Sequence, residues 1–186
     1  MTSSFEIRGS LLRREARARG DGFTIVELVS VLLLLGILSA VALSRLVGDS
    51  AFAPAFAADE IVAFTRLAQQ TALARQDAAV RVEVVADGTD WRLRVRVDPG
   101  TGAVDLREQR VARKNTAIVA ASGATSLPLS TSPLVLAFDG LGALASATIG
   151  AVTLDPSIGV ALTVTGDASY AVCIESTGHA MRGTCA

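Results

Sequence analysis

The sequence is poor in the residues that usually build catalytic and metal sites. It has one His and two Cys among 186 residues, so a histidine cluster for a metal and an all-cysteine structural zinc site are both excluded. Aromatic residues make up 4% and the formal net charge at pH 7 is -1, so neither base-stacking platforms nor a strong overall attraction for nucleic acid is expected. With no nucleophile motif and no phosphate-binding glycine loop, we expect neither an enzyme nor a bound cofactor or metal.

Apolar residues, in contrast, make up 51% of the chain. The longest apolar run, 23–43, reads FTIVELVSVLLLLGILSAVAL and carries one charge, Glu27. A helix of this length would span about 31 Å, the thickness of a bilayer core. Residues 1–22 hold five Arg against three acidic residues, so the positive-inside rule places them in the cytoplasm and the rest of the chain across the membrane. The alternative is a buried core helix.

The charge of Glu27 requires a partner, because an ionised side chain inside a membrane span is costly. Gly22 and Phe23 stand directly before the run. A cut between them would create a cationic α-amine at the start of the helix. Glu27 could then pair with this amine or with that of a neighbouring copy.

The sequence GFTIVE at 22–27, followed by the apolar run, resembles the signal of type IV prepilins. In that family a prepilin peptidase cuts after the Gly and methylates the new N-terminal Phe, and the Glu supports assembly. The resemblance therefore implies cleavage between Gly22 and Phe23, N-methylation of Phe23 and an assembly role for Glu27.

A second cleavage site is an alternative. Ala40, Val41 and Ala42 form an A-x-A pattern at the end of the apolar run, as signal peptidase would require. Cleavage after Ala42 would release a soluble periplasmic protein. The run is longer than a usual signal-peptide core, however, and Glu27 would then have no role.

The chain after the apolar run is predicted to continue as a helix over 44–76. Apolar and small residues recur there near a 3.6-residue period and would form one buried face, namely Ile61, Phe64, Leu67, Ala68, Thr71 and Ala72. Pro54 lacks the N–H that a helix interior needs, so it should kink or locally break this helix. The alternative is a separate amphipathic helix after a loop at 49–56.

From residue 79 the apolar period changes to two, which predicts strands. Residues 80–85 and 91–97 form the clearest hairpin, around a turn at 87–90, and 103–112 is a third strand. An irregular loop is expected at 122–133, with shorter strands at 134–138, 149–154, 158–165 and 169–175. The predicted fold class is α+β, a long N-terminal helix packed on an antiparallel β-sheet head. The chain is predicted to have four parts. Residues 1–22 are a leader peptide, 23–43 a transmembrane and assembly helix, 44–76 an amphipathic helix that continues into the head, and 77–186 the β-sheet head.

Three segments of the head are similar to the GspH/FimT-like minor pilins and pseudopilins. They are LAQQTALAR at 67–75, FDGLG at 138–142 and YAVCIESTG at 170–178. The resemblance implies a pilin-like fold and a minor subunit of a type II secretion pseudopilus or a type IV pilus. It also implies a single-pass protein of the bacterial inner membrane with its head in the periplasm. The implied partners are a prepilin peptidase, other pilin subunits, an inner-membrane assembly platform and membrane lipid.

Four arginines, Arg81, Arg92, Arg94 and Arg96, are predicted to share one face of the first hairpin. They could form a basic docking face for a neighbouring subunit, or for DNA in a DNA-uptake or adhesion pilin. The alternative is a solvated sheet face whose charges are balanced by nearby acidic residues. DNA-binding members of the family use a G-R-x-R tail, and the GHAM sequence at 178–181 departs from it. Nucleic acid is therefore not an expected partner.

The two cysteines, Cys173 and Cys185, would lie in an oxidising compartment if the head is periplasmic. The segment between them would fold back as a hairpin and bring the sulfurs close. We therefore predict a disulfide, stabilising by roughly 3 kcal/mol. The alternative is two free or separately buried thiols.

Overall fold

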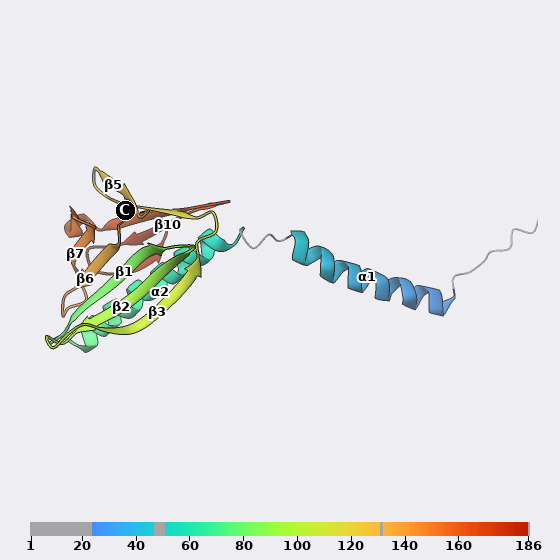
Figure 1. Cartoon of the computed structure of the whole chain (residues 1–186), viewed down its shortest axis with the longest axis horizontal. Helices are drawn as coiled ribbons and strands as arrows, with labels where there is room; N and C mark the ends of the chain where they lie inside the picture. The colour runs from blue at the N-terminus through green and yellow to red at the C-terminus, as the bar shows by residue number, and fades with distance from the viewer. Residues whose placement is uncertain (1–23, 47–50, 131, 186) are drawn as a thin grey trace, which may run out of the picture. The chain divides into compact units, whose positions relative to one another are not determined.

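The computed structural model describes residues 24–46, 51–130 and 132–185, and Figure 1 shows the chain. The chain divides into two compact units, Met1–Leu46 and Val47–Ala186. The first contains α1 (Ile25–Leu46), and the second contains α2 (Ala53–Ala74) and all the strands.

Helix α1 is built from Leu, Ile, Val and Ala with few interruptions. Its first turn is capped by Thr24, whose hydroxyl oxygen accepts a hydrogen bond from the Glu27 N–H at 3.2 Å, as an N-cap residue does. Across the described residues, no helix has both the length and the apolar character that crossing a membrane requires.

The predicted helix over 44–76 is represented by the end of α1, up to Leu46, and by α2, which begins at Ala53. Ala51 and Phe52 form a turn, and Pro54 lies in the first turn of α2, where a missing N–H leaves no hydrogen bond unmade. The alternative of a separate amphipathic helix therefore agrees better with the described residues, but the loop expected at 49–56 was too long, because α2 already begins at Ala53. Residues 47–50 lie outside the described residues. The predicted buried face is present, with Leu67 partly buried and the other five residues buried.

Two antiparallel sheets complete the second unit, which gives the α+β class predicted from the sequence. The first sheet has the order β3-β2-β1-β6-β7-β8, with bounds β1 Ala79–Asp87, β2 Asp90–Asp98, β3 Val104–Ala112, β6 Leu134–Phe138, β7 Leu144–Ile149 and β8 Val152–Leu154. The second has the order β11-β10-β9-β4-β5, with bounds β4 Ala117–Ser122, β5 Thr125–Pro128, β9 Val160–Thr165, β10 Ser169–Ile174 and β11 Ala180–Arg182. A short 3-10 helix, η1, spans Pro156–Ile158.

The first hairpin is confirmed residue by residue. Strands β1 and β2 pair from Ala79 with Asp98 to Asp87 with Asp90, so the buried valines of both strands face one side, namely Val80, Val82, Val84, Val95 and Val97. Trp91 is buried at the start of β2, and its indole N–H donates to the Thr116 hydroxyl oxygen at 2.7 Å. The hairpin thus supplies the apolar surface on which α2 packs.

Three details of the strand prediction were wrong. The expected loop at 122–133 contains β5, which pairs with the unpredicted strand β4. The expected strand at 149–154 contains β8 but only the last residue of β7, which begins at Leu144. Gly150 turns the chain between the two strands with a φ of 57°. Strand β11 was also not predicted, and it closes the edge of the second sheet beside β10.

Helix α2 contacts both sheets, including β1, β2 and β3 of the first and β9, β10 and β11 of the second. Figure 1 shows it lying along one face of β1, β2 and β3. Its buried side chains and those of both sheets form one hydrophobic core. Three long-range polar contacts also tie α2 to the C-terminal segment: Gln69 to Thr177 at 2.9 Å, Arg66 to Ala180 at 2.8 Å and Asp59 to Arg182 at 2.8 Å.

Two of the family-like segments meet at the C-terminal half of α2. The Gln69 side-chain amide donates to the backbone oxygens of Gly142, at 3.2 Å, and Thr177, at 2.9 Å. Gly178 has a φ of 83°, and a Cβ placed on it would lie 1.9 Å from the Gly142 oxygen. Only glycine therefore fits where the last hairpin touches the 138–142 turn.

We expect Gly178→Ala to lower the free energy of unfolding by about 3 kcal/mol or more, because left-handed strain and overpacking act together. Chemical denaturation of the purified protein measures this. The control is Gly88→Ala, also in the left-handed region with a φ of 61° but with open space around it, which should cost about 1–2 kcal/mol. Equal losses of unfolding free energy in the two variants would show that the close approach of Gly178 to Gly142 adds nothing to the cost of the left-handed backbone.

Candidate functional site

The residues of the prepilin-like signal are only partly described. Gly22 and Phe23 lie outside the described residues. Glu27 lies in the first turn of α1 and is exposed, and its backbone oxygen accepts a hydrogen bond from the Ser30 hydroxyl at 2.8 Å. Cleavage, methylation and the assembly role of Glu27 therefore stay predictions.

The outward face of β1, β2 and β3 carries a dense set of charges. Because side chains alternate along a strand, the apolar residues of the hairpin point to the core and the arginines point away from it. We call the outward set the paired-charge face, and it comprises Arg81, Arg92, Arg94, Arg96, Arg110, Glu83, Asp87, Asp98, Asp105 and Glu108.

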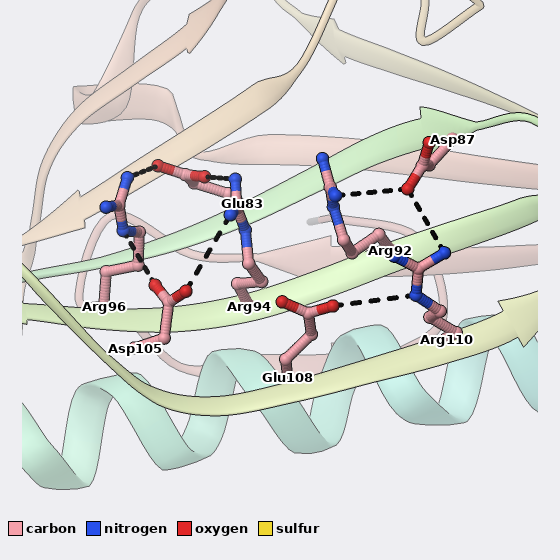
Figure 2. Close-up of polar contacts among 8 residues, drawn as sticks. All are labelled: Glu83, Asp87, Arg92, Arg94, Arg96, Asp105, Glu108 and Arg110. Atoms are coloured by element: carbon pink, nitrogen blue, oxygen red, sulfur yellow. Dashed lines mark hydrogen bonds and ion pairs between the residues drawn. The ribbon is translucent and has the colours of Figure 1, made fainter.

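Glu83 is the centre of the first group on this face, as Figure 2 shows. Its two carboxylate oxygens bind Arg94 at 2.6 Å and Arg96 at 3.2 Å, while the Glu83 side chain is only 12% exposed. Asp105 contacts the same two arginines from β3, at 3.8 Å and 2.9 Å. The hydrogen bond to Glu83 and the charge of Glu83 raise the pKa of Arg96 above its ordinary value. Two cations and two anions therefore form one closed group.

Asp87 is the centre of the second group, also drawn in Figure 2. Its carboxylate contacts Arg92 at 3.1 Å and Arg110 at 3.4 Å. Arg92 and Arg110 are directly opposite each other in the pairing of β2 with β3, where two like charges would repel, so Asp87 relieves that repulsion. Glu108 contacts Arg110 at 3.7 Å.

Every arginine that the sequence singled out on this face has a carboxylate partner, including Arg81 with Asp98 at 3.9 Å. The face holds as many acidic as basic side chains, which gives no net attraction for a phosphate backbone. This arrangement favours the balanced-face interpretation, and the docking role stays a prediction. The sequence analysis did not assign Asp87 and Asp98 to the face. They are the last residues of β1 and β2, where the apolar alternation that identifies a strand ends.

The predicted disulfide is present in the structure. Cys173 lies in β10 and Cys185 lies beyond β11, with their Cα atoms 5.0 Å apart. It links the end of the chain to the second sheet. Elsewhere in the described ranges, no three His, Cys, Asp or Glu side chains gather as a metal site would need.

The arrangement of one core helix against antiparallel sheets, with glycine turns at 138–142 and 178, is that of a pilin-like subunit head. The family described as type II transport protein GspH matches residues 57–178, about two thirds of the chain. The chain belongs to this family of pilin-like minor subunits.

The solved structures include one similar chain, the type IV minor pilin FimU of Pseudomonas aeruginosa. It is 17% identical, and the match covers 69% of this chain and 87% of that chain with a TM-score of 0.46. No curated protein matches the chain.

We expect Glu83→Gln to lower the free energy of unfolding by about 1–2 kcal/mol, between the small value of exposed ion pairs and the larger cost of leaving buried charges unpaired. Thermal and urea denaturation measure this. Glu108→Gln is the matched control, since its contact with Arg110 is long and more than a third exposed, and it should change the stability by less than about 0.5 kcal/mol. If the Glu83 variant is as stable as the control, the ion pairs of Glu83 contribute no more to the free energy of unfolding than an exposed ion pair does.

Proposed function

We propose that this protein is a minor pilin or pseudopilin subunit of a type II secretion pseudopilus or a type IV pilus. It is made as a prepilin, cut between Gly22 and Phe23 by a prepilin peptidase and methylated at Phe23. The segment 23–43 holds it in the bacterial inner membrane with the head in the periplasm, until the assembly platform adds it to the filament. The observation that carries this proposal is the occurrence in one chain of a GspH-family head and the GFTIVE signal next to an apolar run.

The proposed role of Glu27 follows from the cost of a charge in an apolar environment. In an assembled bundle of helices, the carboxylate is stabilised by the α-amine that cleavage creates at Phe23 of the same or a neighbouring subunit. Gly36, Ser30 and Ser39 support the same association, because small and hydroxyl residues let apolar helices approach closely.

The head supports the proposal as a unit with its own core and a disulfide. The core is formed within Val47–Ala186, so it does not depend on the assembly helix. The Cys173–Cys185 bond suits an oxidising compartment such as the periplasm. Nothing in the paired-charge face or in the GHAM tail favours the alternative of a DNA-uptake pilin.

We expect the mature protein to begin at Phe23 with a methylated amine, because the Gly22–Phe23 junction matches the prepilin signal. Intact-mass spectrometry of the membrane-extracted protein checks this. A chain that begins at Leu43 would instead support the release of a soluble periplasmic protein, and an uncut chain would contradict both forms of processing.

We expect Glu27→Gln to be cleaved normally but to enter filaments at least about tenfold less, which corresponds to roughly 1.4 kcal/mol of lost pairing. The ratio of this subunit in sheared filament fractions to that in the membrane measures the effect. Val31→Ala, one turn further along α1 at an exposed position, is the control for a general change in the helix surface. Equal incorporation of the Glu27 variant and the control would rule out the pairing.

A further inference from the structure

Two phenylalanines at the start of α2 are exposed to solvent. Phe52 is 62% exposed and Phe56 is 49% exposed, and they lie one turn apart, since the Phe56 N–H donates to the Phe52 carbonyl at 2.9 Å. The other aromatic side chains of the described residues are buried or half-buried. Phe64, Trp91 and Phe138 are buried in the core and Tyr170 packs against it, so Phe52 and Phe56 differ from every other aromatic residue of the described ranges and require a separate explanation.

The two rings border an apolar hollow of about 280 Å³. Its lining consists of Phe52, Ala53, Phe56, Arg110, Val111, Ala112 and Lys114, so it contains two basic side chains and no acidic one. Arg110 is shared with the paired-charge face, where its partners lie at 3.4 Å and 3.7 Å. The hollow is therefore an apolar surface with cations at its border.

A second hollow of about 450 Å³ adjoins the first through their shared lining residue, Lys114. It is formed by the turn between β1 and β2 and by the segment 113–116, and it presents Arg113 and Lys114. The Arg113 guanidinium stacks on the Trp91 ring at 4.8 Å, which fixes its position. The segment 110–114 reads RVARK, with three cations and no acid in five residues.

The position of this surface along the chain indicates what covers it. Eight residues separate the proposed membrane segment 23–43 from Phe52. They reach about 14 Å if helical and about 30 Å if fully extended, whereas the headgroup layer itself is about 5–7 Å thick on each side of the bilayer. The covalent chain therefore keeps Phe52 and Phe56 within reach of the lipid headgroups at a high effective concentration.

We propose that this surface docks the head onto an anionic phospholipid bilayer while the subunit waits in the membrane. Phe52 and Phe56 enter the interface between headgroups and acyl chains, as the apolar residues of interfacial helices do. Arg113 and Lys114 face the lipid phosphates, as basic side chains next to an anionic membrane surface do. The inference rests on the proposed membrane anchoring by 23–43.

The test uses the full chain in nanodiscs, with Phe56→Trp as the reporter and Leu141→Trp as the control. Leu141 is 80% exposed in the turn that Gln69 holds at the other half of α2. The discs contain phosphatidylcholine brominated near the glycerol backbone, alone or mixed with phosphatidylglycerol. The signal of the native Trp91, which is buried, is measured in the unsubstituted protein and subtracted.

We expect bromine to quench the residue 56 reporter but not the residue 141 reporter, and the quenching to increase with phosphatidylglycerol. About 1 M salt, which screens charges beyond roughly 3 Å, should reverse that increase. Lys114→Asn should lower the ratio of docked to free heads about fivefold, the equivalent of one interfacial cation. Asn tolerates the left-handed backbone at this position, where φ is 42°. Arg75→Gln, which removes an exposed cation at the far end of α2, should change nothing.

Three results would overturn the inference. The first is a residue 56 reporter that stays unquenched although the chain remains in the disc. The second is quenching that responds neither to phosphatidylglycerol nor to salt. The third is a reporter that is shielded only in assembled filaments, which would assign the surface to a neighbouring copy. Loss of the chain from the discs, seen as a fall in the protein-to-lipid ratio, would instead refute the membrane anchor and the inference with it.

Discussion

The burial of one face of α2 between two sheets is the constraint on which the head depends. The face combines bulky side chains such as Ile61 and Phe64 with small ones such as Ala58, Ala68 and Ala72, all almost inaccessible to solvent. The small residues let strands of both sheets approach the helix, and the bulky ones fill the space between them. Because both sheets share this helix, neither has a complete core without it.

The same constraint explains why charge is gathered on the outer side of the first sheet. Val80, Val82 and Val84 face α2, so the intervening positions of β1 must face away from it. Long arginines on the outer side can cover the strands with their apolar stems while their guanidinium groups meet carboxylates. The outer face is thus densely charged yet balanced, and the inner face is dry.

The sequence predicted those parts of the head whose signals are local. The β1–β2 hairpin has strict alternation and the turn at 87–90, and the buried face of α2 has a clear helical period. Strand β4, in contrast, reads AIVAAS, and alanine and serine are weak strand formers, so its place is decided by pairing with β9. The break between β7 and β8 depends on Gly150, which the sequence alone does not distinguish from other glycines.

In the candidate site, too, the features with a local sequence signal were predicted and those that depend on distant segments were missed. The arginines were found because they share one parity along β2, but their partners Asp87 and Asp98 lie at strand ends, where alternation is less informative. The meeting of Gln69, Gly142 and Gly178 joins segments far apart in the sequence, and no local pattern reports such a contact. The exposed pair Phe52 and Phe56 was missed because a turn before Pro54 was treated as the interior of one continuous helix.

The contacts of α2 with the C-terminal segment also set an order of events during synthesis. Arg66 and Asp59 bind residues that lie 114 and 123 positions later in the chain. At the usual rate of translation, the ribosome needs about 6–25 s to synthesise this stretch before the partners of Arg66 and Asp59 exist. Throughout that interval the buried face of α2 lacks β10 and β11, and the head cannot close. The two sheets therefore enclose α2 only after nearly the whole chain has been made.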